Sequence, residues 1–312
     1  MKKLALGIDI GGTNTAFGLV DIEGSILFEE SRSTKSFPTP SDLIEFLYNH
    51  PQIKKNIDSI IGIGIGAPNG NHFTGTIEYA PNLDWKGIIP LQALFEYKFN
   101  KPTQLTNDAN AAAVGEKIFG NAKEYKNFIT ITLGTGLGSG IYIDNKLVYG
   151  AHGIAGEYGH IRVIPNGRTC KCGRLGCLET YASSTGVVRS INELNSKNKT
   201  NSLIHTLESP NAKNVFELAE SGDKFCKEII DYTADILGSS LADFAAFSDP
   251  EAYILFGGIA QSGATFANKV KVAMERNILN IYKDKITIAI STLHDKNAAI
   301  LGNAATIFSN HL

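Results

Sequence analysis

The hydrophobic pattern of the chain begins with two apolar strands around a glycine turn. Residues 4–21, LALGIDIGGTNTAFGLVD, place apolar runs on both sides of a Gly-Gly-Thr segment, which predicts a β-hairpin. Gly11 and Gly12 can take positive φ and let backbone amides approach a ligand with no side chain in the way. Thr13 adds a hydroxyl group, and Asp9 places a carboxylate beside the turn.

The same pattern of strand, glycine turn, strand and closing aspartate returns at residues 128–144, FITITLGTGLGSGIYID. Here Gly134, Thr135 and Gly136 occupy the place of the first turn. A repeated supersecondary unit indicates two related subdomains that face one another. Amides and hydroxyl groups cradle phosphates, and a neighbouring carboxylate suits Mg²⁺. The two turns together therefore predict a site for a polyphosphate and its metal ion.

A third strand with a glycine end lies at residues 253–260, YILFGGIA. Gly257 and Gly258 leave bare backbone against which the flat base of a nucleotide can lie. The chain contains neither the G-x-x-x-x-G-K-[ST] P-loop nor a G-x-G-x-x-G that opens a helix after a first strand. A dinucleotide-binding fold is therefore unsupported.

Between the two hairpins the pattern predicts a helix and a buried strand. Residues 41–50, SDLIEFLYNH, have helical periodicity, and Ser41 or Asp42 is in position to cap the helix after Pro40. Residues 59–68, SIIGIGIGAP, form a short apolar run that is typical of a buried strand entering a loop.

The segment at residues 68–87, PNGNHFTGTIEYAPNLDWKG, is rich in Asn, Gly and Pro, which predicts a loop. Asn82 could form a hydrogen bond with a sugar, and Trp85 could form an apolar wall beside it. Equally, Asn is a common turn residue and Trp a common core residue, so the sequence leaves both interpretations open.

A strand and an alanine-rich helix follow at residues 104–120, QLTNDANAAAVGEKIFG, and Asn107 and Asp108 lie where the helix begins. In one interpretation Asp108 caps the helix, because Asp is among the residues preferred there. In the other it is a general base. A carboxylate at the positive end of a helix stays ionised and points out of the carboxyl end of the strand, where ligands of α/β sheets bind. Phosphoryl transfer needs such a carboxylate to accept the hydroxyl proton, and Asn107 could fix a sugar beside it.

Three of the four cysteines fall in one short stretch at residues 156–180, GEYGHIRVIPNGRTCKCGRLGCLET. The short spacings of Cys170, Cys172 and Cys177 favour a metal over disulfides, because Cys-x-Cys can present two thiolates to one ion, whereas a bridge between those two would strain the loop. With His160 they complete a tetrahedral ligand set of the kind that holds structural zinc.

Two alternatives remain open for this stretch. The cysteines could be reduced residues of a glycine-rich surface loop, and His152 could replace His160 as the fourth ligand, although it lies farther from the cysteines. Glu157 and Glu179 flank the motif. A metal ion that fixes the loop would also fix these two carboxylates as acceptors for a polyhydroxylated ligand.

Length and composition set the class of the protein. A chain of 312 residues with 43% hydrophobic and 19% charged residues is typical of a globular protein of about two domains. The formal net charge of −2 and the lack of Lys/Arg runs give no argument for nucleic acid or membrane binding. The apolar run after the two N-terminal lysines breaks at Asp9, too soon for a signal peptide, and no stretch approaches the length of a membrane span. Thiolates on a metal ion, with Cys226 left for a helical core position, fit a reducing cytoplasm.

The remaining chain is mostly helical in pattern. Residues 186–248 carry helical periodicity, and the end of the chain predicts a strand followed by an alanine-rich helix. The apolar face of this last helix is expected to pack on the first domain, so that the chain returns to where it began.

Taken together, these motifs resemble the ROK family of sugar kinases and repressors. The similar segments are D-x-G-G-T in the first hairpin, L-G-T-G-x-G in the second, E-x-G-H followed by C-x-C-G-x-x-G-C-x-E, and the Gly-Gly pair, and they extend from Leu4 to the last helix. The family implies an α/β protein of the actin-like ATPase (ribonuclease H-like) fold, with two α/β domains flanking a cleft and a small zinc knuckle. We expect the smaller domain to comprise residues 1–118 and 296–312, and the larger domain residues 119–295.

The resemblance also implies roles for individual residues. Asp108 would be the catalytic base, and Asp9 would assist the Mg²⁺ ion bound with ATP. The sugar site would be lined by Asn82, Asn107, Asp108, Glu157, His160 and Glu179, with His160 both touching the sugar and binding zinc. Where such proteins have a Pro-Gly pair, this chain has an asparagine between Pro68 and Gly70, which leaves the local loop and the sugar specificity open. A homodimer or homotetramer is expected from the family.

The leading hypothesis is an ATP-dependent hexose kinase that transfers the γ-phosphate in line to the 6-hydroxyl of glucose, with Asp108 as general base. A kinase for another hexose, such as N-acetylmannosamine or fructose, is the alternative within the same class. A sugar-sensing repressor is less favoured, because the first hairpin begins at Leu4 and leaves no room for a helix-turn-helix module before it. An actin-like ATPase without sugar chemistry is disfavoured by the two glutamates at the cysteine motif.

Overall fold

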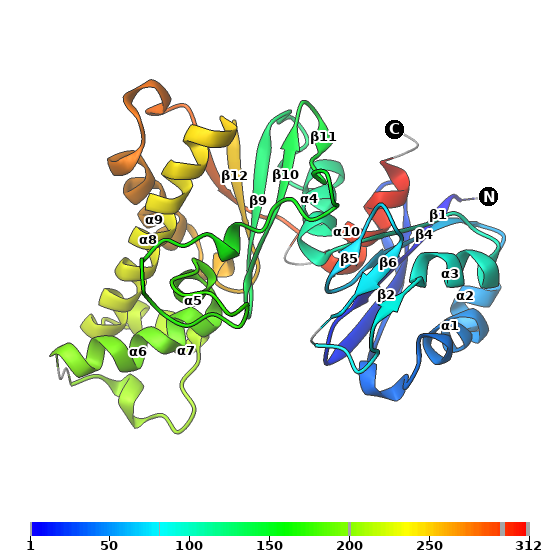
Figure 1. Cartoon of the computed structure of the whole chain (residues 1–312), viewed down its shortest axis with the longest axis horizontal. Helices are drawn as coiled ribbons and strands as arrows, with labels where there is room; N and C mark the ends of the chain where they lie inside the picture. Colours follow the sequence, from blue (N-terminus) through cyan, green and yellow to red (C-terminus); the bar gives the residue numbers. More distant parts are fainter. Residues whose placement is uncertain (1, 81, 199–200, 294–296, 310–312) are drawn as a thin grey trace. The chain divides into compact units, whose positions relative to one another are not determined.

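Within the part of the chain that the structure describes, two five-stranded sheets form the framework (Figure 1). The computed structural model describes residues 2–80, 82–198, 201–293 and 297–309. The first sheet contains β1 (Leu4–Ile10), β2 (Asn14–Asp21), β3 (Ile26–Ser33), β4 (Ile60–Gly66) and β8 (Thr103–Thr106). The second contains β9 (Phe128–Leu133), β10 (Leu137–Ile143), β11 (Lys146–Leu147), β12 (Ala252–Phe256) and β13 (Thr287–Ile290).

The two sheets share one topology. The strand order is β3-β2-β1-β4-β8 in the first sheet and β11-β10-β9-β12-β13 in the second. In each, an antiparallel hairpin is extended on one side by parallel strands. The hairpins are β1–β2 and β9–β10, the two segments whose patterns match in the sequence. The predicted internal repeat is therefore confirmed.

The chain divides into two compact units, which are described separately below. Unit 1 comprises Met1–Glu124, Leu147–Ala155 and Thr292–Leu312, and unit 2 comprises Tyr125–Lys146 and Gly156–Ser291. The division expected from the sequence instead assigns residues 147–155 to the larger domain. Its boundary at 295/296 lies outside the described residues. The domain division expected from the sequence stays a prediction.

A row of glycines lets helix α10 (Ala298–Phe308) lie flat on the first sheet. In β4, Gly62, Gly64 and Gly66 alternate with isoleucines, so the glycines line one face while the isoleucines enter the core on the other. A Cβ atom on Gly64 would stand 1.8 Å from the backbone oxygen of Asn303 in α10. The predicted packing of the last helix on the first domain is confirmed, and it requires residues without side chains on this face.

The same helix fixes helix α4 (Asp108–Ile118), which begins at the candidate base. The two helices cross where Gly115 meets Gly302, and a Cβ on Gly302 would stand 2.5 Å from the backbone oxygen of Ala111. Small residues at a crossing let two helix backbones touch. Residues 300–308 of α10 are buried, so α4 rests on a helix that cannot shift easily. This packing fixes the position of Asp108.

Unit 1 also contains α1 (Pro40–Asn49), α2 (Pro51–Lys55), α3 (Leu91–Phe99) and the 3₁₀ turn η1 (Thr34–Ser36). The predicted cap of α1 is wrong, because Thr39, rather than Ser41 or Asp42, occupies the cap position. The Thr39 hydroxyl accepts from the Asp42 amide, and the Asp42 carboxylate accepts from the Thr39 amide. This capping box has Pro40 at the start of the helix, where its missing N–H costs nothing.

The segment at residues 68–87, predicted as a loop, contains short strands. Strands β5 (Gly70–Asn71), β6 (Thr76–Glu78) and β7 (Ile88–Ile89) form a small antiparallel sheet. Asn71 stabilises it, because its Nδ2 donates to Glu78 Oε1 at 3.1 Å and to His152 O at 3.2 Å. The loop prediction is wrong because β5 and β6, with 2 and 3 residues, are too short to show a period in the sequence.

Unit 2 carries its helices after the second hairpin. They are α5 (Glu179–Ala182), α6 (Ser184–Asn198), α7 (Ala212–Glu220), α8 (Lys224–Ser248) and α9 (Ala264–Asn277), with the 3₁₀ turns η2 (Tyr158–His160), η3 (Leu203–Thr206), η4 (Ala260–Ser262) and η5 (Asn280–Tyr282). Cys226 in α8 is fully buried, so its predicted place in the core is confirmed. Among the described residues, no helix combines the length and the apolar character needed to cross a membrane.

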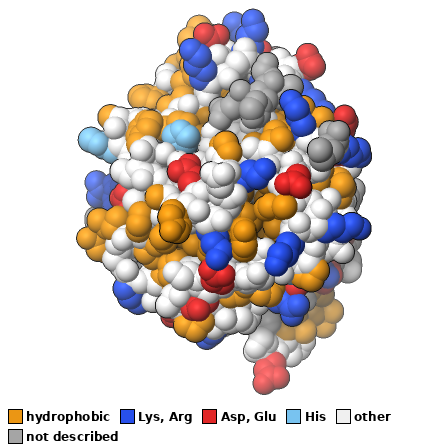
Figure 2. Space-filling view, turned by 90° about the vertical axis from the view of Figure 1, so that its right-hand side faces the viewer, with side chains coloured by type: hydrophobic (Ala, Val, Ile, Leu, Met, Phe, Trp, Pro, Cys, Tyr) orange, Lys and Arg blue, Asp and Glu red, His pale blue; other side chains and the backbone are white. Residues whose placement is uncertain are grey.

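Charged side chains of both signs are mixed on the face drawn in Figure 2. Basic and acidic groups are interspersed there with apolar ones, and among the residues described on that face neither charge gathers in a continuous patch. This pattern fits the formal net charge of −2. The residues described on that face therefore form no positive surface of the kind that binds a nucleic-acid backbone.

Replacing Gly64 with alanine tests the glycine face. The added Cβ would meet the Asn303 backbone, which cannot move without displacing α10. We therefore expect Gly64→Ala to lower the free energy of unfolding by about 1–3 kcal/mol. Gly258→Ala is the matched control, because a Cβ there meets no atom within 4 Å. Chemical denaturation compares the two variants, and equal stability would contradict the close packing.

Candidate functional site

The residues predicted to form the site divide between the two units. Unit 1 holds Asp9, Gly11, Gly12, Thr13, Asn82, Asn107 and Asp108. Unit 2 holds Gly134, Thr135, Gly136, Glu157, His160, Cys170, Cys172, Cys177, Glu179, Gly257 and Gly258. Each group is described within its own unit.

The turn of the first hairpin packs against Asn82. The Gly11 amide donates to Asn14 O at 2.9 Å and closes the turn. A Cβ on Gly12 would stand 2.5 Å from the backbone oxygen of Asn82, so this position requires glycine. Neither Gly11 nor Gly12 uses the positive φ that glycine allows. Close approach of the Asn82 backbone explains the glycine at position 12.

Unit 1 contains two candidate carboxyl groups, and the charge of one raises the pKa of the other. Asp9 lies near the carboxyl end of β1, and Asp108 begins α4. Burial, together with the negative charge of Asp108, raises the pKa of Asp9 to about 6. Burial also raises the pKa of Asp108, and the hydrogen bond from the Ala109 amide opposes that rise. The Asp108 side chain still reaches solvent, so protein atoms surround it closely without sealing it off.

Asn107, and not Asp108, caps α4. Its Oδ1 accepts from the Asn110 amide at 2.7 Å. Asp108 is the first residue of the helix, and its Oδ1 accepts from the Ala109 amide at 2.9 Å. Of the two interpretations that the sequence leaves open, capping therefore belongs to Asn107, and Asp108 presents a carboxylate at the positive end of the helix. Because the Asn107 carboxamide oxygen is engaged, its NH₂ group is the part that can serve a ligand.

Trp85 occupies the core of unit 1. Its exposed fraction is 5%, and its Nε1 donates to Phe37 O at 2.9 Å. Of the two interpretations of Trp85, the core position is confirmed and the apolar wall is wrong. Asn82, in contrast, is exposed beside the first glycine turn.

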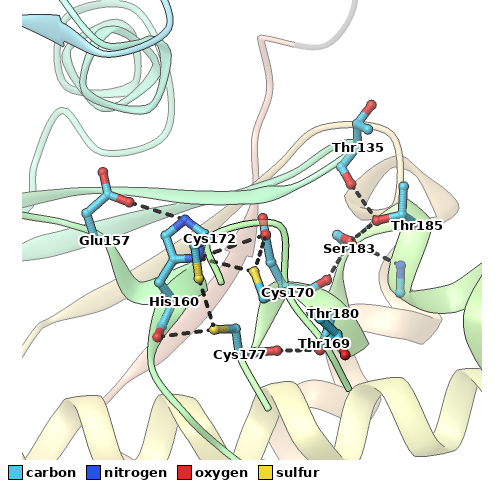
Figure 3. Close-up of polar contacts among 12 residues, drawn as sticks. Thr135, Glu157, His160, Thr169, Cys170, Cys172, Cys177, Thr180, Ser183 and Thr185 are labelled. Atoms are coloured by element: carbon cyan, nitrogen blue, oxygen red, sulfur yellow. Dashed lines mark hydrogen bonds and ion pairs between the residues drawn. The ribbon is translucent and has the colours of Figure 1, made fainter. Parts of the chain in front are cut away.

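Four potential metal ligands converge in unit 2 (Figure 3). One ligand atom from each of His160, Cys170, Cys172 and Cys177 lies within 4.8 Å of the others. Cys172 Sγ is 3.7 Å from Cys177 Sγ, and Cys170 Sγ is 3.7 Å from His160 Nδ1. Ligands at about 2.3 Å from a zinc ion stand about 3.8 Å apart at the corners of a tetrahedron, so these residues fit such an ion. The predicted grouping of one histidine with three cysteines is confirmed.

Tight turns bring the thiols together. The Cys170 amide donates to Arg174 O at 2.9 Å, and Gly173 within that turn has a φ of 85°. Gly176, with a φ of 77°, has no room for a side chain, because a Cβ would stand 1.8 Å from Ile164 O. The two glycines of C-x-C-G-x-x-G-C are thus required by the backbone that presents the ligands.

The buried thiols of this cluster favour a soft cation. Burial raises the pKa of the Cys170 thiol, and the neighbouring Glu179 adds to that rise. Burial likewise raises the pKa of Cys177. Thiolates in such surroundings are stabilised by a bound ion, and thiolate with imidazole suits zinc better than a hard cation. His152, the alternative ligand, lies in unit 1 and is not part of the cluster.

Both flanking glutamates contact the cluster. Glu157 Oε2 lies 3.7 Å from His160 Nε2, whereas His160 Nδ1 faces Cys170. Glu179 Oε1 accepts from Cys170 Sγ at 3.0 Å and lies 3.9 Å from His160 Nδ1. The side chain of Glu157 is 58% exposed and that of Glu179 is 20% exposed. An ion held by His160 and Cys170 would therefore fix the residues that contact both carboxylates.

A pocket of about 420 Å³ lies in unit 2 beside Gly258. It is lined by Ser184, Ala212, Lys213, Phe216, Glu217, Glu220, Gly258, Ile259, Gln261 and Ser262. Gly257 precedes it with a φ of 100°, and a Cβ there would stand 2.8 Å from Leu133 O. Sequence reasoning identified the glycines and missed the lining from α7 and η4, because Phe216 at helical spacing looks like an ordinary core residue.

Arg168 holds the cysteine loop against α5 and α6, and sequence reasoning missed it. The residue is 6% exposed, its Nε donates to Glu193 Oε1 at 2.9 Å, and its Nη2 forms an ion pair with Glu193 Oε2 at 2.9 Å. Its Nη1 donates to Thr180 O at 2.6 Å and to Gly186 O at 2.9 Å. The guanidinium also lies 4.4 Å from the centre of the Tyr181 ring. A single arginine in a polar loop has no sequence signature that would reveal these contacts.

The chain is an α/β protein with a candidate metal site, as its two sheets of one topology and its His-Cys₃ cluster show. The chain belongs to the ROK family, whose model matches residues 5–309. It is 34% identical over 316 residues to the glucokinase of Streptomyces coelicolor, covering 96% of each chain. It is 31% identical to the xylose repressor of Caldicellulosiruptor bescii, covering 98% of this chain and 78% of the repressor.

Among solved structures, the ROK family glucokinase of Streptomyces griseus in complex with glucose and AMPPNP is similar. The TM-score is 0.80 and the identity 33%, over 97% of this chain and 98% of that chain. The predicted actin-like fold with two α/β parts is confirmed by this similarity and by the family match. The His-Cys₃ cluster is consistent with the zinc motif of the family.

Removing one ligand tests the metal site. We expect about one metal ion per chain and a strong loss of metal in Cys172→Ser, because three remaining ligands leave a tetrahedral site open. Cys226→Ser should keep the ion, since Cys226 is buried in α8 outside the cluster. Elemental analysis by mass spectrometry after dialysis measures both variants. Equal metal content in the two, or none in the unmodified protein, would contradict the assignment.

Proposed function

We propose that the chain is an ATP-dependent hexose kinase that transfers the γ-phosphate of ATP to the 6-hydroxyl group of glucose. Membership of the ROK family and similarity to glucokinases support this proposal. The observation that carries it is the position of Asp108, a carboxylate that opens α4 while Asn107 supplies the cap.

Asp108 is the group that accepts the proton of the attacking hydroxyl. Phosphoryl transfer asks for alignment, charge neutralisation and one carboxylate beside the hydroxyl, and little covalent chemistry from the protein. Burial raises the pKa of Asp108, which makes the carboxylate a stronger base than an ordinary aspartate. The N-terminus of α4 stabilises its anionic form before the proton is transferred.

The sugar is assigned to six side chains that can exchange hydrogen bonds with hydroxyl groups. They are Asn82, Asn107, Asp108, Glu157, His160 and Glu179. Carboxylates accept hydrogen bonds from sugar hydroxyl groups, while the Asn107 NH₂ group donates, since its oxygen is engaged in the cap. The zinc ion that fits the cluster would be structural, holding His160 and the loop around Glu179 in place.

The nucleotide is assigned to the two glycine turns and to the pocket of unit 2. Residues 11–13 and 134–136 offer amides and hydroxyl groups to the phosphates. Asp9 would hold Mg²⁺ directly or through water, and the ion supplies neutralisation of charge on the β- and γ-phosphates. The pocket beside Gly257 and Gly258 would take the base of ATP, with Phe216 as an apolar contact.

A different hexose is the alternative substrate within the same reaction. N-acetylmannosamine or fructose would need the same base and the same phosphate contacts, and would differ in the hydroxyl groups that are recognised. The loop before the small sheet keeps this alternative open, because Asn69 separates Pro68 from Gly70, the first residue of β5.

Sugar sensing without catalysis is the second candidate function. The similarity to xylose repressors favours it, at 31% identity against 34% for the glucokinase of Streptomyces coelicolor. A sensor would need the sugar contacts and would not need a base beside the hydroxyl. The paired carboxyl groups of Asp9 and Asp108 favour the kinase.

ADP release with Mg-ATP across a panel of hexoses tests the reaction and its substrate. We expect sugar-dependent turnover that is highest with glucose. In Asp108→Asn, kcat should fall by about 10²–10⁴-fold, because the amide keeps a hydrogen-bond site and cannot accept the proton. Sugar affinity measured by calorimetry should change little.

The outcomes of this panel separate the candidates. Highest turnover with another hexose would keep the mechanism and change the substrate. Loss of sugar binding together with turnover in Asp108→Asn would assign Asp108 a structural role. Binding of a sugar without turnover on any hexose would contradict the kinase and favour the sensor.

The raised pKa of Asp9 predicts loss of activity in mild acid. Asp9 must be ionised to assist Mg²⁺, and Asp108 must be ionised to accept a proton, so protonation of either removes a required form. Burial raises both pKa values, so kcat/KM for ATP should fall as the pH drops through about 6 and recover above it. A pH profile that stays flat down to the pKa range of ordinary aspartates would contradict these roles.

A further inference from the structure

The turn of the second hairpin, residues 134–136, accepts hydrogen bonds from the corner between α5 and α6 (Figure 3). This corner, residues 179–186, is called the α5–α6 corner below. The Ser184 amide donates to Gly134 O at 2.8 Å. Thr185 Oγ1 donates to Thr135 O at 2.9 Å. Two consecutive carbonyl groups of the turn are therefore held by two consecutive residues of the corner.

The third residue of the turn touches the same corner. A Cβ on Gly136 would stand 2.8 Å from Glu179 Oε2, so the turn lies directly against this carboxylate. The other oxygen of the Glu179 carboxylate accepts from Cys170 Sγ at 3.0 Å. Glu179 therefore contacts both the turn and the cysteine loop.

Ser183 connects the two ends of the corner. Its Oγ lies 2.6 Å from Glu179 O and 3.0 Å from Thr185 Oγ1. It also accepts from the Gly186 amide at 3.1 Å. The two hydroxyl groups have two protons for three oxygen–oxygen contacts. When Thr185 donates to Thr135, Ser183 therefore donates either to Glu179 O or to Thr185 Oγ1.

These carbonyl contacts set the direction of the amides in the turn. In a trans peptide the N–H points away from the C=O of the same unit, and the described chain contains no cis peptide bond. Holding Thr135 O toward Thr185 therefore aims the Gly136 amide away from the corner. Holding Gly134 O toward Ser184 does the same for the Thr135 amide. Amides directed in this way can donate to phosphate oxygens.

We propose that Thr185 is a positioning residue for the phosphate end of the nucleotide site. The proposal rests on the proposed function, because it assigns phosphate to the turn. Thr185 acts through the Thr135 carbonyl, which accepts the hydrogen bond of its hydroxyl group. Ser184, whose amide holds Gly134, also lines the pocket assigned to the base. The corner therefore sets the turn relative to that pocket.

Calorimetry of Thr185→Val without sugar tests this role, with a non-hydrolysable ATP analogue and adenosine as the two ligands. We expect the analogue to bind about three- to tenfold more weakly, because one orienting hydrogen bond is lost. Adenosine should bind unchanged, since it carries no phosphate for the turn. Sugar affinity should also stay unchanged, and Thr185→Ser should restore binding of the analogue because it restores the hydroxyl.

Thr206→Val is the matched control. Thr206 Oγ1 donates to Leu203 O at 2.8 Å in an exposed turn of the same unit, so the variant removes an equivalent bond elsewhere. Binding of the analogue by this variant should match that of the unmodified protein.

Three outcomes would overturn the proposal. One is unchanged affinity of Thr185→Val for the analogue. Another is equal weakening of analogue and adenosine, which would mean that the pocket rather than the turn is disturbed. The third is failure of Thr185→Ser to restore binding. If the unmodified protein bound neither nucleotide, the proposed function would fail together with this role, and that result is distinct from the other three.

Discussion

The convergence of four ligand atoms within 4.8 Å is the constraint on which the candidate sites of unit 2 depend in this account. Three of them come from one short loop whose glycines permit the necessary turns, and the fourth comes from His160. Glu157 and Glu179 both contact the ligand cluster, and Glu179 lies in turn against Gly136 of the second hairpin. The ligand cluster therefore contacts the candidate sugar ligands Glu157 and Glu179 directly, and the candidate phosphate-binding turn through Glu179. A disturbance of the ligand cluster should reach both of them, as is common for residues around a metal ion.

Unit 1 positions its candidate groups by packing between backbones. Glycines on β4 let α10 lie on the sheet, and the contact of Gly115 with Gly302 lets α4 lie on α10. Asp108 is thus held by a helix whose own position is fixed by close packing. The two sheets share one topology. Close packing between backbones positions the candidate groups of unit 1, whereas the ligand cluster positions those of unit 2. In unit 1, Asp9 and Asp108 lie at the carboxyl ends of strands β1 and β8, where ligands of α/β sheets bind.

Features with a local signature could be predicted from the sequence. Alternating apolar runs around glycines indicate the hairpins, C-x-C spacing indicates the ligand cluster, and Asp108 follows a strand at the start of a helix. Features that depend on distant contacts could not be predicted, because Thr185 and Thr135 are 50 positions apart and neither segment alone indicates their bond. Phe216 shares the helical spacing of core residues, so its place in the pocket has no signature of its own. The sequence predicts Ser41 or Asp42 as the cap of α1 in place of Thr39, because all three residues can cap a helix and only the backbone conformation separates them.

The central claim is that a phosphoryl group moves from ATP to a sugar hydroxyl. Phosphorus-31 NMR of the protein mixed with Mg-ATP and glucose follows the fate of that group directly. The proposed reaction predicts a growing sugar phosphate monoester signal in equal amount to the ADP formed. Growth of inorganic phosphate with ADP, and no sugar phosphate with glucose or any other hexose, would contradict it.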